Sequence, residues 1–173
     1  MKVAFQMDPI GSVDFRADST FRLAEEAQAR GHEIWHYTPD RLSWREGRVV
    51  ARAEPLTVRR EAGNHAHLGE TVDLDLADVD VVWLRQDPPF DMAYITTTHI
   101  LERLKGRSLV VNDPFWVRNA PEKLLVLDFP DLTPPTTIAR DLGVLRAFRA
   151  RHGDVILKPL YGNGGAGVFR IDP

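Results

Sequence analysis

The chain has 173 residues, which is enough for one domain and part of another. Its composition is ordinary for a globular protein, and a net charge of -3 provides no polybasic surface for nucleic acid or an anionic membrane. The chain contains no cysteine, which excludes disulfides and cysteine-based chemistry. No apolar run approaches the roughly 20 residues that cross a bilayer, and the N-terminal apolar run is too short for a signal peptide. We therefore expect a cytoplasmic protein with no nucleic-acid or membrane partner.

The first part of the chain predicts alternating strands and helices. Residues 3–7 predict a strand, and residues 19–30 a helix with Asp18 as its N-cap and Gly31 as its C-terminal stop. A second strand is expected over residues 33–37. This β-α-β spacing is typical of a Rossmann-like parallel sheet with a right-handed crossover.

The elements that follow are expected to extend this sheet. Residues 48–52 and 56–60 predict a β-ribbon interrupted at Pro55, and the polar residues 61–75 predict a loop. A nearly continuous apolar run over residues 79–84 is typical of a strand covered on both faces. A helix over residues 90–104 and a strand over residues 109–111 follow.

The pattern restarts near residue 120. A helix is expected from residue 120 to about 128, with Pro121 at an early position. After a break, residues 136–139 predict a strand, residues 142–151 a helix and residues 155–160 a strand. We expect an α/β domain over residues 1–120 and the unfinished start of a second domain over residues 121–173.

The glycine-dense turn at residues 162–167 is the most informative motif. Four glycines in six residues let backbone N–H groups approach a ligand, and successive free N–H groups suit a phosphate. Lys158, at the end of the preceding strand, adds a positive charge. Val168 and Phe169 favour a second strand rather than the helix of a P-loop. We expect a hairpin with a flexible, nucleotide-binding tip, and the alternative is a plain hairpin turn.

Several strand ends carry polar residues of interest. Asp8, Asp87 and Asp113 each precede a proline at the end of a predicted strand. Ligands bind at the carboxyl ends of parallel strands, and Arg85 could hold a carboxylate there. The alternatives are that Asp-Pro merely starts a turn and that Arg85 forms an ion pair with Asp87. Lys123, expected at a helix start that disfavours cations, either meets a ligand or is a solvated surface lysine.

Five segments, taken in order, resemble the bacterial glutathione synthetases of the ATP-grasp superfamily. They are Met7-Asp8-Pro9-Ile10, residues 85–91 (Arg-Gln-Asp-Pro-Pro-Phe-Asp), Val111-Asn112-Asp113-Pro114, Glu122-Lys123-Leu124, and residues 156–160 with the glycine tail. The resemblance spans the whole chain. It implies a pre-ATP-grasp, substrate-binding domain over residues 1–120 and the start of an ATP-grasp, α+β domain from residue 121.

The resemblance also implies roles for individual residues. It places Arg85 in the substrate pocket, and together with the strand-end positions of Asp8 and Asp87 this leads us to expect that Asp8, Arg85 and Asp87 bind substrate. The residues expected to bind ATP are Lys123, Lys158, Gly162, Asn163, Gly164, Gly165, Ala166 and Gly167. Tyr161 departs from the pattern, since some family members carry an acid there.

The implied reaction is the ATP-dependent ligation of γ-L-glutamyl-L-cysteine and glycine through an acyl phosphate. Mg²⁺, or Mn²⁺, is the implied metal, with ligands expected beyond Pro173. We therefore expect no catalytic or metal-binding residues in this chain and no ligase activity from the chain alone. The resemblance further implies a homo-oligomer, namely a homotetramer.

Two other functions are also compatible with the sequence. One is a different ATP-grasp carboxylate–amine ligase, such as an enzyme that joins D-alanine or adds glutamate, although residues 85–91 favour glutathione synthetases. The other is a non-catalytic nucleotide-binding or assembly domain.

Overall fold

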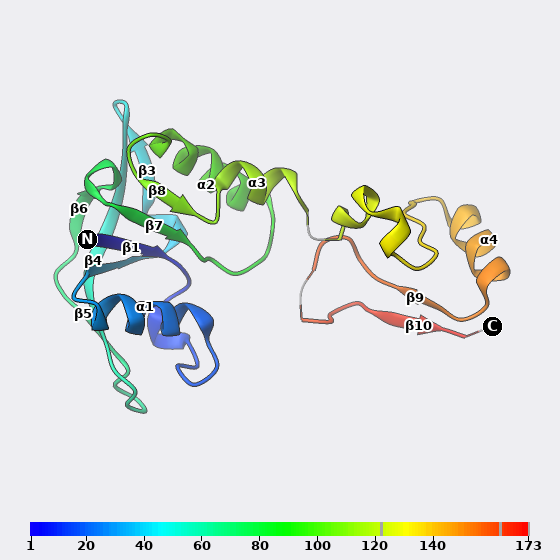
Figure 1. The fold of residues 1–173 in the computed structure, drawn as a ribbon, viewed down its shortest axis with the longest axis horizontal. Helices are drawn as coiled ribbons and strands as arrows, with labels where there is room; N and C mark the ends of the chain where they lie inside the picture. Colours follow the sequence, from blue (N-terminus) through cyan, green and yellow to red (C-terminus); the bar gives the residue numbers. More distant parts are fainter. Residues whose placement is uncertain (122, 163, 173) are drawn as a thin grey trace. The chain divides into compact units, whose positions relative to one another are not determined.

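The computed structural model describes residues 1–121, 123–162 and 164–172, which form two compact units, Met1–Asn119 and Ala120–Pro173. The first unit contains an eight-stranded sheet with the order β3-β4-β2-β1-β7-β8, in which β5 and β6 also pair with β4 (Figure 1). Its strands are β1 (Lys2–Gln6), β2 (Glu33–Tyr37), β3 (Leu42–Arg45), β4 (Arg48–Val58), β5 (Ala66–Leu68), β6 (Val72–Asp75), β7 (Val81–Leu84) and β8 (Leu109–Val111). Its α-helices are α1 (Ser19–Ala29), α2 (Met92–Leu101) and α3 (Pro114–Asn119). None of the helices in the described residues is both long and apolar enough to span a membrane.

The centre of the sheet is parallel, because β1 pairs in parallel with β2 and β7, and β7 pairs in parallel with β8. Alternate residues of β1 point to opposite faces. Val3 and Phe5 belong to the same buried cluster as Phe21 of α1, whereas Ala4 belongs to the cluster that contains Leu101 of α2. Helices α1 and α2 thus cover opposite faces of the sheet (Figure 1). The expected α/β class with a parallel sheet is confirmed.

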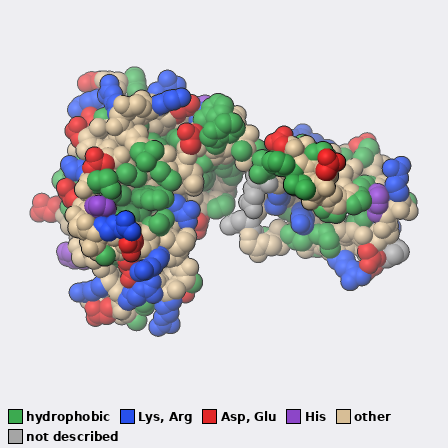
Figure 2. Space-filling model, in the orientation of Figure 1, with side chains coloured by type: hydrophobic (Ala, Val, Ile, Leu, Met, Phe, Trp, Pro, Cys, Tyr) green, Lys and Arg blue, Asp and Glu red, His purple; other side chains and the backbone are tan. Residues whose placement is uncertain are grey.

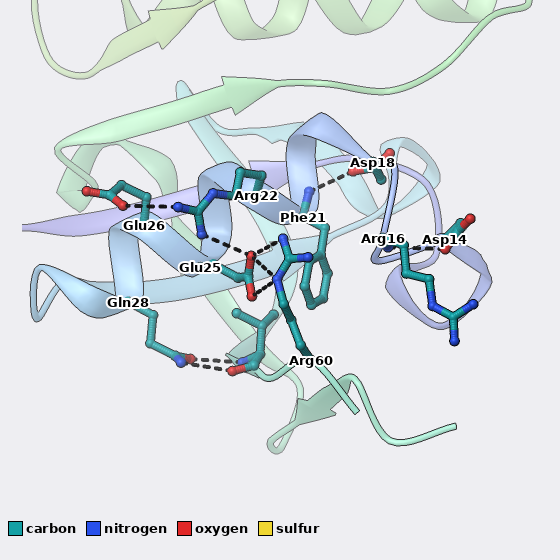
Figure 3. A network of polar contacts seen from close by, with 10 residues as sticks. Asp14, Arg16, Asp18, Phe21, Arg22, Glu25, Glu26, Gln28 and Arg60 are labelled. Atoms are coloured by element: carbon teal, nitrogen blue, oxygen red, sulfur yellow. Dashed lines mark hydrogen bonds and ion pairs between the residues drawn. The ribbon is translucent and has the colours of Figure 1, made fainter. Parts of the chain in front are cut away.

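Helix α1 is fixed to the end of β4 by side-chain hydrogen bonds (Figure 3). The amide of Gln28 donates to the carbonyl of Val58 at 2.9 Å and accepts from the Val58 N–H at 2.8 Å. Arg60 donates two hydrogen bonds to the Glu25 carboxylate, from Nε to Oε1 at 2.8 Å and from Nη2 to Oε2 at 2.7 Å. The hydrogen bond from Arg60 lowers the pKa of Glu25, against the opposing effect of burial and with a further lowering from Arg22. Asp18 caps the helix as expected, accepting from the N–H of Phe21.

Two predictions for the region after β2 were wrong. Residues 48–58 form one continuous strand through Pro55, whose carbonyl accepts a hydrogen bond from the Gly69 N–H at 2.9 Å. Residues 61–75 are not simply a loop, since they contain β5 and β6, both antiparallel to β4. The long strand β4 offers hydrogen-bonding partners to these polar segments, and this tertiary pairing outweighs their weak local strand propensity.

The second unit contains α4 (Leu142–His152) and the antiparallel hairpin β9 (Val155–Leu157) and β10 (Phe169–Ile171). The expected hairpin is therefore confirmed, with a first strand shorter than predicted. None of the described residues in this unit is buried. Its exposed apolar side chains include Leu127, Leu132, Leu142 and Phe169. Figure 2 shows hydrophobic side chains gathered on the surface of this unit.

Two predictions for the second unit were also wrong. Within the range 120–128, where a helix was expected, Lys123 and Leu124 form a turn and a short 3-10 helix, η5 (Leu125–Asp128), follows, while Glu122 lies outside the described residues. Pro130 disfavours helical backbone at the residue before it, and a helix this short needs packing that the segment lacks. The strand expected over residues 136–139 is irregular, because neither described strand of this unit pairs with it.

Candidate substrate and nucleotide sites

The carboxyl ends of β1 and β7 bring together three residues predicted to bind substrate. Because these strands are parallel neighbours, with the Arg85 N–H donating to the Gln6 carbonyl at 2.8 Å, the residues that follow them meet at one edge of the sheet. The Asp87 N–H donates to Asp8 Oδ2 at 2.8 Å, which joins the two strand ends directly. Asp8, Arg85 and Asp87 thus lie in one neighbourhood.

Arg85 is anchored by the first turn of α1. Its Nε donates to Thr20 Oγ1 at 3.1 Å, and its Nη2 donates to Ser19 Oγ at 2.8 Å. Arg85 is half-buried and Thr20 is buried, so these hydroxyls fix the guanidinium. The guanidinium is bonded to hydroxyls rather than paired with Asp87. A fixed guanidinium at a strand end has the geometry to bind a carboxylate.

Tyr94 of α2 is a member of this neighbourhood that the sequence did not indicate. Burial raises the pKa of its phenol, the charge of Arg85 lowers it, and the carboxylates of Asp87 and Asp8 raise it further. All three charged groups therefore act on Tyr94. A tyrosine in a largely apolar helix carries no sequence signal that separates it from a packing residue.

Asp113, at the end of β8, serves a different purpose. Its Oδ1 accepts from the N–H groups of Phe115 and Trp116, at 2.9 and 3.2 Å, at the start of α3. For this Asp-Pro pair the structural alternative holds, because the carboxylate organises the local turn. The candidate substrate site is formed by β1 and β7.

The glycine turn of the second unit has backbone conformations that favour glycine. Gly164, Gly165 and Gly167 have φ angles of 58°, 77° and 69°, in the left-handed region that favours glycine. A Cβ added at Gly167 would lie 3.2 Å from Cγ of Pro159, so a larger residue would crowd the base of the turn. Asn163 lies outside the described residues. The geometry of the described part suits close approach by a phosphate.

Lys123 and the glycine turn are brought together in this unit. The Lys123 ammonium donates to the carbonyls of Pro159 and Gly162, both at 2.8 Å. Lys123 lies in a turn, not at the start of a helix as expected, so the argument from an unfavourable helix dipole does not apply. Lys158 is exposed, immediately before Pro159. Two predicted phosphate-binding lysines thus flank the start of the glycine turn, and both can neutralise phosphate charge.

A metal site does not fit the part of the chain that the structure describes. No group of three or more His, Asp or Glu residues among the described residues is placed to hold a metal ion. Mg²⁺ in nucleotide sites takes carboxylate and phosphate oxygens in octahedral geometry, and these residues do not supply such a set.

Comparison with known proteins gives the same family for both units. Residues 1–118 match the family described as "Prokaryotic glutathione synthetase, N-terminal domain", and residues 122–173 match "Prokaryotic glutathione synthetase, ATP-grasp domain". The chain is 59% identical to the glutathione synthetase of Mesorhizobium japonicum over 171 residues, which are 99% of this chain and 55% of that protein.

Two further relatives agree. The glutathione synthetase of Brucella melitensis is 60% identical over 171 residues, covering 99% of this chain and 55% of that protein. The enzyme of Rhodopseudomonas palustris is 58% identical over 173 residues, covering 100% and 55%. The chain spans about half the length of the curated relatives it matches. The resemblance noted in the sequence is confirmed, and the chain belongs to the prokaryotic glutathione synthetase family.

Proposed function

We propose that this chain forms part of an ATP-dependent ligase that joins γ-glutamylcysteine to glycine. The observation that carries the proposal is the contact of Lys123 with both ends of the Pro159–Gly162 segment, in the part of the chain that matches an ATP-grasp domain. The name shared by the relatives, glutathione synthetase, supports this reaction. In the proposal, the first unit binds the dipeptide and the second unit binds ATP.

The strand ends of the first unit complement the charges of the dipeptide. At neutral pH γ-glutamylcysteine carries one ammonium and two carboxylates. Arg85, fixed by Ser19 and Thr20, would bind a carboxylate, and Asp8 and Asp87 would face the ammonium. This arrangement would orient the dipeptide so that its cysteine carboxylate is the one presented for activation.

The second unit would hold the triphosphate that activates this carboxylate. When bound, ATP supplies a phosphoryl group that converts the carboxylate into a reactive acyl phosphate. Lys123 and Lys158 would neutralise phosphate charge, and N–H groups of the described glycines would donate to phosphate oxygens. Closure of the glycine turn would limit the access of water to the acyl phosphate. Mg²⁺ or Mn²⁺ and a homotetramer are still predictions from the family resemblance. A cytoplasmic location is still a prediction from the sequence.

The nucleotide half of the proposal is tested by titrating ATP into the chain in a calorimeter. We expect Lys123→Met to weaken ATP binding roughly 10-fold or more, because a hydrogen bond to a charged group contributes about 1.5–3 kcal/mol. Lys105→Met removes an exposed lysine of the first unit and is the matched control. Equal affinities for wild type and Lys123→Met would contradict the assignment.

The substrate half is tested with γ-glutamylcysteine, D-alanine and glutamate as separate titrants. The proposed reaction is supported if the chain binds γ-glutamylcysteine and binds neither D-alanine nor glutamate. Preferred binding of D-alanine or glutamate would instead indicate a different ATP-grasp ligase.

A further inference from the structure

Two histidines from different β segments hold the backbone that follows β1. Nε2 of His36, on β2, lies 3.2 Å from the carbonyl oxygen of Asp8. Nε2 of His65, just before β5, lies 2.8 Å from the carbonyl oxygen of Ile10. The segment between these contacts begins with Asp8, one of the candidate substrate residues.

This segment lies beside open space. Residues 8–11 line a hollow of about 430 Å³, together with residues from β2, the following turn, β4 and β5. On that side no side-chain packing from the described residues holds the backbone of the segment, whereas the side chain of Ile10 is buried in the core on the other side. Hydrogen bonds to its carbonyls have a correspondingly larger share in setting its position.

The proton on each imidazole follows from its partner. A carbonyl oxygen only accepts, so Nε2 of both histidines must carry the hydrogen. Burial lowers the pKa of His36. The hydrogen bond to the Asp8 carbonyl and the charge of Glu54 raise this pKa, and the charge of Arg41 lowers it. His36 is 3% exposed, and its Nδ1 has no hydrogen-bond partner among the described residues. A neutral imidazole with a single donor directed at Asp8 fits these observations.

Both rings are held by their surroundings. Glu54, whose Oε2 is 3.9 Å from Nδ1 of His36, is itself bonded to Arg41 and Thr71, each at 2.9 Å. His65 is stacked on Phe15 with a centroid separation of 5.5 Å and meets Phe21 edge-on at 5.8 Å. The two donors are therefore fixed points to which the segment is attached.

We propose that His36 and His65 are positioning residues for Asp8. They hold the main chain so that the Asp8 carboxylate receives the Asp87 N–H across the β1–β7 edge and faces the dipeptide. Neither histidine touches the substrate in this arrangement. The part of the inference that concerns the dipeptide rests on the proposed function, whereas the effect on the Asp8–Asp87 contact does not.

The test replaces His36 by phenylalanine and by glutamine. His36→Phe keeps a ring but removes the donor, whereas His36→Gln places an amide donor near the position of Nε2. The first readout is the hydrogen exchange of the Asp87 amide by NMR. The second is the dissociation constant for γ-glutamylcysteine.

We expect His36→Phe to speed Asp87 exchange and to weaken dipeptide binding, each roughly 2- to 12-fold, as the loss of one hydrogen bond predicts. His36→Gln should restore both, which a purely space-filling role would not. His67→Phe, at an exposed position on β5, is the control and should change neither. Wild-type exchange at Asp87 in His36→Phe, or equal defects in the phenylalanine and glutamine variants, would overturn the proposal.

His65→Phe provides a second route if His36→Phe does not fold. It keeps an aromatic ring beside Phe15 and Phe21 while removing the donor to Ile10, and it should also speed Asp87 exchange. Unchanged exchange in this variant counts against the proposal. If neither the wild type nor any variant binds the dipeptide, the proposed function fails. The hydrogen exchange of the Asp87 amide then still decides whether the histidines position Asp8.

Discussion

Replacement of Arg85 by lysine tests the substrate site most sharply, because it keeps the charge and removes the geometry. Nε and Nη2 of Arg85 are already bonded to Thr20 and Ser19, so the guanidinium can be anchored and still face a ligand. A lysine has one compact ammonium, which cannot keep both anchors and also present a planar fork to a carboxylate.

The size of the effect follows from the hydrogen bonds at stake. A hydrogen bond to a charged group contributes about 1.5–3 kcal/mol, and we expect Arg85→Lys to lose about 2 kcal/mol of dipeptide binding. At about 1.4 kcal/mol for each factor of ten, this is roughly a 30-fold rise in the dissociation constant. Ser19→Ala removes a single neutral anchor and should cost only about 0.5–1.5 kcal/mol, or roughly 2- to 12-fold.

Calorimetric titration of γ-glutamylcysteine into each variant measures these values. Arg103→Lys, at an exposed position in the short helix η4 (Glu102–Leu104), is the matched control and should bind as the wild type does. Thermal unfolding of all variants checks that the fold is intact. The reasoning is refuted if Arg85→Lys binds within twofold of wild type, or if the control is weakened as much.

The contacts between α1 and β4 support two further predictions. Gln28→Ala should lower the free energy of unfolding by about 2 kcal/mol, because the buried N–H and carbonyl of Val58 lose their partners. Urea titration measures this loss. A loss no larger than that caused by Arg30→Ala, at an exposed position, would contradict the prediction. Because Arg60 lowers the pKa of Glu25, the carboxylate stabilises the fold above its ordinary pKa, and this contribution disappears as pH falls through the lowered value. Glu25→Gln should therefore flatten the acid side of the stability profile, and an unchanged slope would count against the ion pair.

Signals contained within one short segment predicted the fold best. The cap formed by Asp18 depends on N–H groups only a few residues away, and it lies where expected. The hairpin around the glycine turn is equally local. The strands β5 and β6 were missed because their partner is β4, and nothing within residues 61–75 records that an eleven-residue strand lies alongside them.

In the candidate site, too, local sequence signals were predictive and long-range contacts were not. The places of Asp8, Arg85 and Asp87 after two predicted strands pointed to one sheet edge, and the parallel pairing of β1 and β7 brings them together there. That they bind substrate stays a prediction. The groups that fix and surround them were not predictable, since Thr20 lies 65 residues from Arg85 in the chain. The charges of Arg85, Asp8 and Asp87 also shift the pKa of Tyr94 on α2, and nothing in the sequence of α2 indicates this link.

The three Asp-Pro pairs show why a motif at a strand end does not by itself define a site. Asp113 directs its carboxylate to N–H groups of its own segment, at Phe115 and Trp116, so that local capping explains why an acid stands there. Asp8 instead accepts from the N–H of Asp87, in the segment that follows the neighbouring strand β7, beside a fixed guanidinium. A carboxylate that spans two strands organises an edge rather than a turn. Searches for the proposed dipeptide site should therefore centre on the β1–β7 edge, and substitution of Asp113 should alter the start of α3 before it alters binding.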